Sequence, residues 1–163
     1  MNLIHRVLEE MIRFDAGDPR RIQHFLKVWG FAKWIGENEG LDAQTQCILE
    51  VTALVHDIGI HPAEQKYGRC DGKLQEQEGP APARQLLQAL DADDALIDRV
   101  CYLVGHHHTY HEIQGLDYQI LVEADFLVNL YEDGVSTDAV QTALTRVFRT
   151  ASGVQLCRQM FGL

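Results

Sequence analysis

Apolar residues recur every three or four positions along most of the chain, which is the spacing of amphipathic helices. Capping residues, prolines in first turns and closing glycines divide this pattern, and there is almost no strand signal. They predict about seven helices, at 2–14, 19–38, 42–58, 80–90, 94–107, 117–132 and 136–160, with a possible break in the last at Ser152-Gly153. The pattern therefore predicts an all-α fold.

The segment from His61 to Leu74 has the least regular pattern and is predicted to be a loop. Elsewhere short turns join the helices, so these should pack as one orthogonal bundle. The length of 163 residues suits one domain, and no linker or repeat divides it. We expect a single domain over 1–163, with its core at about 20–130 and the helices of 136–160 packed on it.

Composition narrows the class of protein. The chain is 46% hydrophobic and 23% charged, has no apolar run near the ~18 residues of a membrane helix, and starts with an amphipathic helix rather than a signal peptide. We therefore expect a soluble, cytoplasmic protein. The net charge of −10 argues against binding a nucleic-acid scaffold but allows a small phosphorylated substrate. The four cysteines are scattered and predict neither a disulfide framework nor a thiolate zinc site.

The adjacent pair His56-Asp57 lies in the apolar run 51–58, which should be a central, buried helix. An unpaired buried carboxylate costs several kcal/mol, and a divalent cation removes that cost because imidazole and carboxylate are ready ligands. Neighbouring residues diverge by roughly 100° around a helix, so they share one ion only near a helix end, for which Gly59 is a candidate. The alternative is a hydrogen-bonded pair inside a core.

Other segments place metal-binding residue types on apolar helix faces. His24 shares a face with Val28 and Phe31, and Asp125 lies on the stripe of Leu121 and Val128. In the run His106-His107-His108, the second histidine continues the apolar face of the preceding helix. Because several helices each place a histidine or aspartate on a buried face, the sequence indicates a metal site.

The ordered set His24, His56-Asp57 and Asp125 resembles the H…HD…D signature of the HD-domain superfamily of metal-dependent phosphohydrolases. The resemblance covers about 20–130 and implies an all-helical fold with one or two divalent ions. By resemblance, these four residues would hold the first ion. The chain is also similar to an uncharacterised branch of the superfamily whose pattern names no substrate.

Binuclear HD proteins have two further histidine ligands between the HD pair and the last aspartate. Here Glu78 stands where the first would be, and it could be either a ligand or an acid stabilised by the start of the next helix. His107, or else His106, matches the second position. A second ion therefore stays an open prediction.

The predicted loop carries three cations, which we interpret as phosphate contacts in a cap over the site: Lys66, Arg69 and Lys73. Ordinary surface positions are the alternative for each. The favoured function is hydrolysis of a phosphate ester or anhydride by metal-activated water, with Asp57 as the bridging ligand. His106, His108 or Glu76 could be the general acid. Nitrogen and oxygen ligands suit Mn, Fe, Co, Ni or Zn equally.

Two other functions remain open from the sequence. The ligand set also resembles that of some binuclear HD proteins, which implies two irons that activate oxygen as one alternative. The other is a site that binds a nucleotide without turnover and reports on it through an interface. The sequence does not indicate the oligomeric state.

Overall fold

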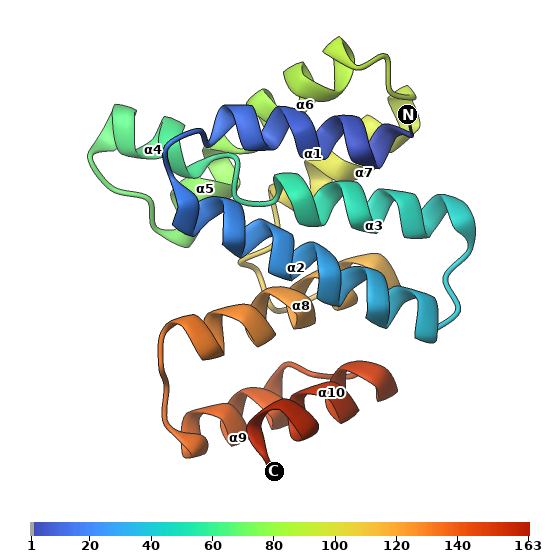
Figure 1. Cartoon of the computed structure of the whole chain (residues 1–163), viewed down its shortest axis with the longest axis vertical. Helices are drawn as coiled ribbons and strands as arrows, with labels where there is room; N and C mark the ends of the chain where they lie inside the picture. The colour runs from blue at the N-terminus through green and yellow to red at the C-terminus, as the bar shows by residue number, and fades with distance from the viewer. Residues whose placement is uncertain (1) are drawn as a thin grey trace.

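The computed structural model describes residues 2–163, which form ten helices and no strand (Figure 1). The all-α prediction is therefore confirmed for these residues. In chain order the helices are α1 (Leu3–Phe14), α2 (Pro19–Asn38), α3 (Ala43–Val55), α4 (Ile60–Tyr67), α5 (Gly72–Glu78), α6 (Pro80–Ala89), α7 (Asp94–Val104), α8 (Leu116–Glu132), α9 (Thr137–Arg146) and α10 (Ala151–Phe161).

Helices α3 and α8 form the centre of the bundle, and α2 packs against both of them. Every residue of α3 from Ile48 to Val55 is buried; most are apolar, and the buried Glu50 accepts hydrogen bonds from Trp29 and Gln46. In Figure 1, α1, α3, α2 and α8 follow one another from top to bottom, and the C-terminal pair α9 and α10 lies beyond α8. The helices that carry His24 and Asp125 and the helix that leads to His56-Asp57 are therefore direct neighbours.

Helix α2 has the bounds that its sequence predicts. Asp18 is the N-cap, and its side chain accepts a hydrogen bond from the backbone N–H of Arg21. Pro19 occupies the first helical position, where its missing N–H costs nothing. Local capping chemistry is enough to fix this helix, and it places His24 on the second turn.

The HD pair lies just beyond the end of α3, in the turn that leads to α4. The helix stops at Val55, three residues earlier than predicted. Gly59 is not the left-handed cap that we expected, since its φ is −77°. A Cβ atom at Gly59 would instead lie 2.7 Å from the backbone nitrogen of Gly79, so glycine allows the α5–α6 junction to approach this turn.

The prediction of a loop over 61–74 is wrong, because α4 and α5 occupy most of it. Gly68 closes α4 with a φ of 71°, and Asp71 caps α5 by accepting the N–H of Leu74. Each of these helices buries few residues, so neither has the long apolar stripe from which a helix can be predicted. Short helices of this kind depend on tertiary packing, here of α4 against α5.

The C-terminal helical stretch breaks at 147–150, several residues before the predicted position. The cause is Glu123, a fully buried residue of α8. Its Oε1 accepts the backbone N–H groups of Arg149 and Thr150, and its Oε2 accepts the Thr150 hydroxyl. The segment 147–150 between α9 and α10 therefore turns towards α8 before α10 begins.

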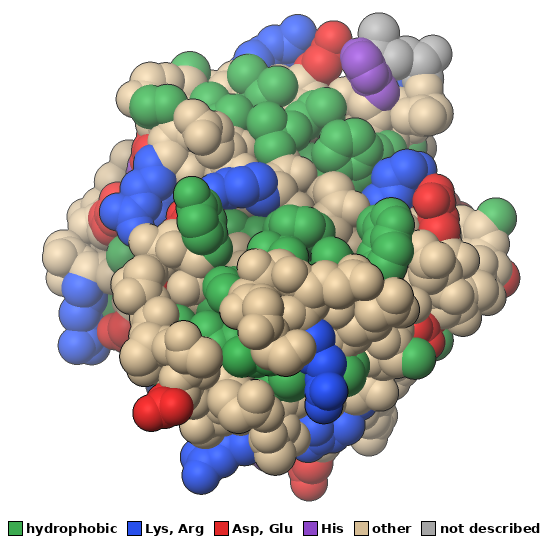
Figure 2. Space-filling model, turned by 60° about the horizontal axis from the view of Figure 1, so that its bottom comes forward, with side chains coloured by type: hydrophobic (Ala, Val, Ile, Leu, Met, Phe, Trp, Pro, Cys, Tyr) green, Lys and Arg blue, Asp and Glu red, His purple; other side chains and the backbone are tan. Residues whose placement is uncertain are grey.

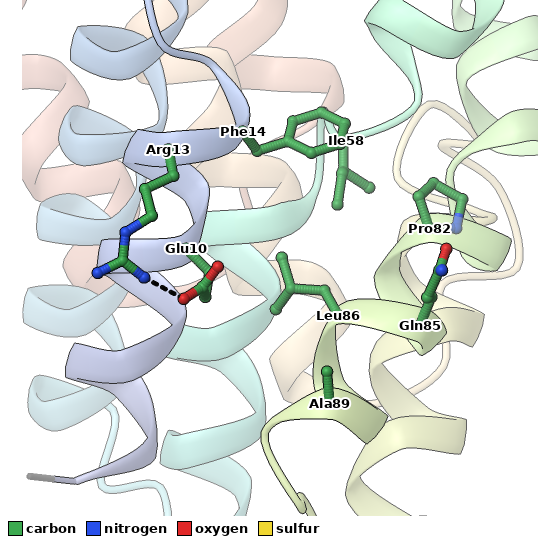
Figure 3. A pocket seen from close by; sticks show the side chains of 8 residues that line it. All are labelled: Glu10, Arg13, Phe14, Ile58, Pro82, Gln85, Leu86 and Ala89. Atoms are coloured by element: carbon green, nitrogen blue, oxygen red, sulfur yellow. Dashed lines mark hydrogen bonds and ion pairs between the residues drawn. The ribbon is translucent and has the colours of Figure 1, made fainter.

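On the face in Figure 2, hydrophobic side chains lie in small groups between scattered basic and acidic ones. A groove of about 410 Å³ lies between α1 and α6 and contains Phe14, Ile58 and Leu86, but none of the predicted ligands (Figure 3). Within residues 2–163, no helix has both the length and the apolar character needed to cross a membrane.

Candidate metal centre

The four side chains predicted to hold the first ion converge at one place between α2, α3 and α8. His24 Nε2 lies 3.3 Å from His56 Nε2, 3.2 Å from Asp57 Oδ2 and 3.2 Å from Asp125 Oδ1. His56 Nε2 lies 3.4 Å from Asp57 Oδ1 and 3.5 Å from Asp125 Oδ1. Two imidazoles and two carboxylates from separate parts of the chain therefore point their polar atoms at a common centre.

The outer nitrogens of the two histidines fix their tautomers. His24 Nδ1 donates to Glu132 Oε1 at 3.1 Å, and His56 Nδ1 donates to the carbonyl oxygen of Ala53 at 2.8 Å. In the neutral rings both Nε2 atoms therefore present lone pairs to each other. Two such nitrogens at 3.3 Å need a proton or a metal ion between them. An Nδ1 hydrogen bond that orients the ring is also the usual arrangement around metal-binding histidines.

The electrostatics of the cluster favour a cation. Burial alone would lower the pKa of His56, but Asp57 and Asp125 raise this pKa to about 9. Burial alone would raise the pKa of both carboxyls, but His56 and His107 hold that of Asp57, and His24 and His56 that of Asp125, well below the ordinary value. The two acids are thus ionised in a buried place, which is stable only with positive charge between them.

A second group of possible ligands adjoins the first and shares Asp57 with it. Asp57, His107 and His108 place donor atoms within 4.8 Å of one another. His107 is 1% exposed, its Nδ1 donates to the Val104 carbonyl, and its Nε2 lies 3.4 Å from Asp57 Oδ1. This Nε2 has no hydrogen-bond partner among the described residues. A buried nitrogen lone pair without a partner is expected at a metal ligand, because the metal ion would be its partner.

His108 is oriented by two side chains. Gln75 donates from its amide nitrogen to the Cys70 carbonyl, so its oxygen accepts the Nε2 proton of His108 at 2.8 Å. The Nδ1 lone pair then faces the hydroxyl of Tyr110 at 3.2 Å. Burial and the neighbouring His107 lower the pKa of His108 to about 4, so the ring is neutral and able to bind a metal. An ion in the second group would compete with Tyr110 for this lone pair.

The donor set fits a divalent first-row ion. Imidazole nitrogen and carboxylate oxygen provide all the atoms in both groups, and none is a thiolate. The first group supplies four side chains, and the second supplies three, with Asp57 able to give one oxygen to each. The residues present therefore fit one ion and leave room for a neighbouring second.

Two predicted ligands of the second ion are not brought to the cluster. Glu78 Oε1 accepts the hydroxyl of Tyr67 at 2.9 Å and pairs with Lys66 Nζ at 3.2 Å. His106 Nδ1 donates to the Tyr102 carbonyl, and its ring stacks on that tyrosine at 4.1 Å. Neither belongs to a group of converging ligands, and His108 takes the place for which His106 was considered.

Among residues 2–163, none of the three cations predicted as phosphate contacts pairs with a side chain of the cluster. Lys66 is paired with Glu78, and Arg69 pairs with Asp71 at 3.5 Å. Lys73 is exposed on the first turn of α5 and forms no ion pair within the described residues. The structure thus gives all three the character of surface residues, the alternative that the sequence left open.

Sequence reasoning missed two side chains that contact the cluster. Glu132 lies two helical turns after Asp125 and bonds to His24, and Lys27 Nζ pairs with the same carboxylate at 3.0 Å. Arg21 lies one turn before His24, with Nη1 at 3.7 Å from Asp57 Oδ2. Both are on the faces of the predicted ligands, so helical spacing was the signal that could have found them.

Comparison with known proteins agrees with this geometry. Residues 21–144 match the HD domain family, and the chain belongs to that family. It is similar to the crystal structure of a predicted HD superfamily hydrolase from an uncultured Thermotogales bacterium, with a TM-score of 0.65 and 25% sequence identity. The likeness covers 98% of this chain and 83% of that one. No curated protein matches the chain.

Proposed function

We propose that the protein is a metal-dependent hydrolase of a phosphate ester or anhydride, with a nucleotide or another small phosphorylated metabolite as substrate. The observation that carries the proposal is the convergence of His24, His56, Asp57 and Asp125 on one buried centre. Membership of the HD domain family supports the same chemistry.

A divalent ion held there would polarise a phosphoryl oxygen and lower the pKa of a bound water towards neutrality. The chain's own residues prepare the place for it. Glu132 and the Ala53 carbonyl hold the rings of His24 and His56 with their lone pairs inward. Asn129 donates to Asp125 Oδ1 at 2.9 Å and fixes that carboxylate. Because the ligands are oriented before an ion arrives, little reorganisation is needed on binding.

Asp57 has a special position in this proposal. Its side chain is 15% exposed, whereas the side chains of His24 and Asp125 are 4% exposed. It is also the residue common to both groups of ligands. Asp57 therefore stands at the open side of the centre, where a substrate would approach. A second ion beside His107 and His108 would use its other oxygen.

The test is a metal-dependent activity screen. Metal-free protein is loaded with Mn²⁺, Fe²⁺, Co²⁺, Ni²⁺ or Zn²⁺ and incubated with nucleotides and sugar phosphates, and released inorganic phosphate is measured. Asp57→Asn should reduce activity by more than about 100-fold, since it removes a ligand rather than a supporting contact. Asp138→Asn, at an exposed position of α9, is the matched control.

Two results would contradict the proposal. Tight nucleotide binding by fully loaded protein without turnover would indicate a regulatory binding module. Oxygen consumption by the iron-loaded protein, without phosphate release from any substrate, would indicate an oxygenase.

A further inference from the structure

Arg21, on the first turn of α2, pairs with the candidate metal ligand Asp57. It is the third residue of α2, and its backbone N–H donates to the Asp18 cap at 3.1 Å. This capping bond fixes the start of the helix, and His24 follows one turn later. The guanidinium of Arg21 then reaches Asp57, with Nη1 at 3.7 Å from Oδ2.

The donors of this guanidinium are free. Among the described residues, no side-chain nitrogen of Arg21 has a hydrogen-bond partner, and 3.7 Å to Asp57 exceeds hydrogen-bond length. Its side chain is nevertheless only 28% exposed. By contrast, Arg99 is 30% exposed and donates three hydrogen bonds, two to Asp117 and one to the Gln114 carbonyl. The half-buried guanidinium of Arg21 is therefore available to a group that approaches Asp57 from solvent.

The other cations near the centre are engaged elsewhere. Lys27 pairs with Glu132, which lies on the outer nitrogen of His24 rather than on its metal-facing side. Lys66 and Arg69 pair with acids of the α4–α5 region. The two buried carboxylates would repel an anionic substrate unless a metal ion and a further cation offset their charge. Arg21 is placed to supply the second of these.

We propose that Arg21 binds the phosphoryl group of the substrate, next to the oxygen that faces Asp57 and its metal ion. The proposal rests on the function proposed above. A guanidinium presents its N–H groups as a planar fork that matches two oxygens of a phosphate, and such charge-assisted bonds are stronger than neutral ones. An ion at Asp57 would take up that carboxylate's charge and release Arg21 from its loose ion pair.

The substitution Arg21→Gln separates phosphate binding from a structural role. The affinity for inorganic phosphate should fall, whereas the affinity for Mn²⁺ should not. Loss of a positive charge 3.7 Å from Asp57 should leave Mn²⁺ affinity unchanged or increase it. Loss of the fork should weaken the binding of inorganic phosphate to the Mn²⁺-loaded protein by about tenfold or more. Arg21→Lys should give an intermediate phosphate affinity, since it keeps the charge and loses the fork.

Isothermal titration of the full chain measures both affinities, first with Mn²⁺ alone and then with inorganic phosphate. Arg158→Gln, at an exposed arginine of α10, is the control and should match the wild type. Phosphate affinity of Arg21→Gln within twofold of the wild type would overturn the role of Arg21 alone. A parallel fall in Mn²⁺ affinity would make Arg21 a structural partner of Asp57. Failure of the loaded wild type to bind phosphate would overturn the proposed function as well.

Discussion

Glu132 should control metal affinity although it is not a metal ligand. Its Oε1 accepts the Nδ1 proton of His24 at 3.1 Å and also pairs with Lys27 Nζ at 3.0 Å. The carboxylate thereby holds the His24 ring with Nε2 inward. Supporting contacts of this type usually change metal affinity by 10–100-fold.

The effect of Glu132 on Mn²⁺ affinity can be divided into that of its hydrogen-bond acceptor and that of its charge. Glu132→Ala removes both the acceptor and the charge, so Mn²⁺ should bind about 10–100-fold more weakly, which corresponds to roughly 1.4–2.8 kcal/mol. Glu132→Gln keeps an oxygen that can accept from His24 and loses only the charge, so its loss should be nearer the lower limit. Competition with a chelator of known affinity measures both constants.

A matched control lies on the same helix as His24. Glu37 pairs with Lys33 at 2.9 Å, one turn apart on an exposed part of α2, and Glu37→Ala should leave Mn²⁺ affinity unchanged. The reasoning would be refuted if Glu132→Ala bound Mn²⁺ within twofold of the wild type while its far-ultraviolet circular dichroism stayed the same.

Three further predictions follow from the cluster and the core. Complete chelation should lower the melting temperature by roughly 5–10 °C relative to protein at 100 times the metal dissociation constant, and an unchanged calorimetric melting curve would contradict this. Glu123→Ala should destabilise the fold to urea by about 3–5 kcal/mol without changing metal content, because buried backbone donors at Thr150 and Arg149 lose their acceptor; a loss under about 1 kcal/mol would exclude that role. The pKa of His56, about 9 without metal, means that its ring carries a proton below that pH, so metal binding at pH 7 should release about one proton and at pH 10 none. Titration calorimetry in buffers of different ionisation enthalpy measures that release, and its absence at pH 7 would be contrary to the expectation.

The first ligand group could be predicted because its members conflict with their surroundings. Asp125 lies on an apolar helical stripe, and His56-Asp57 follow the buried, mainly apolar end of α3, so each needs a partner that the local sequence does not provide. Helix α2 could be placed to the residue because Asp18 and Pro19 are explicit start signals. In these cases the local sequence is sufficient, because capping residues mark where a helix starts and helical periodicity shows which residues share its buried face.

The remaining parts depend on tertiary structure. Helix α7 ends at Val104, so the face that its periodicity defines does not extend through His106 to His108. Which of these histidines faces the centre is set by a turn and by Gln75 of α5. Resemblance to binuclear HD proteins predicts Glu78 as a ligand, yet the path of α4 brings Lys66 and Tyr67 to its carboxylate. Such contacts join separate elements and leave no periodic trace in the sequence.

An anomalous-scattering map of a crystal grown with Mn²⁺ tests the central claim most directly. We expect a peak bonded to Nε2 of His24 and His56 and to carboxylate oxygens of Asp57 and Asp125, at distances of roughly 2.0–2.3 Å. A second peak about 3.5–4 Å away, beside His107 and His108, would show the binuclear form. A fully loaded crystal with its peaks elsewhere, and with these four side chains bonded only to one another, would contradict the account.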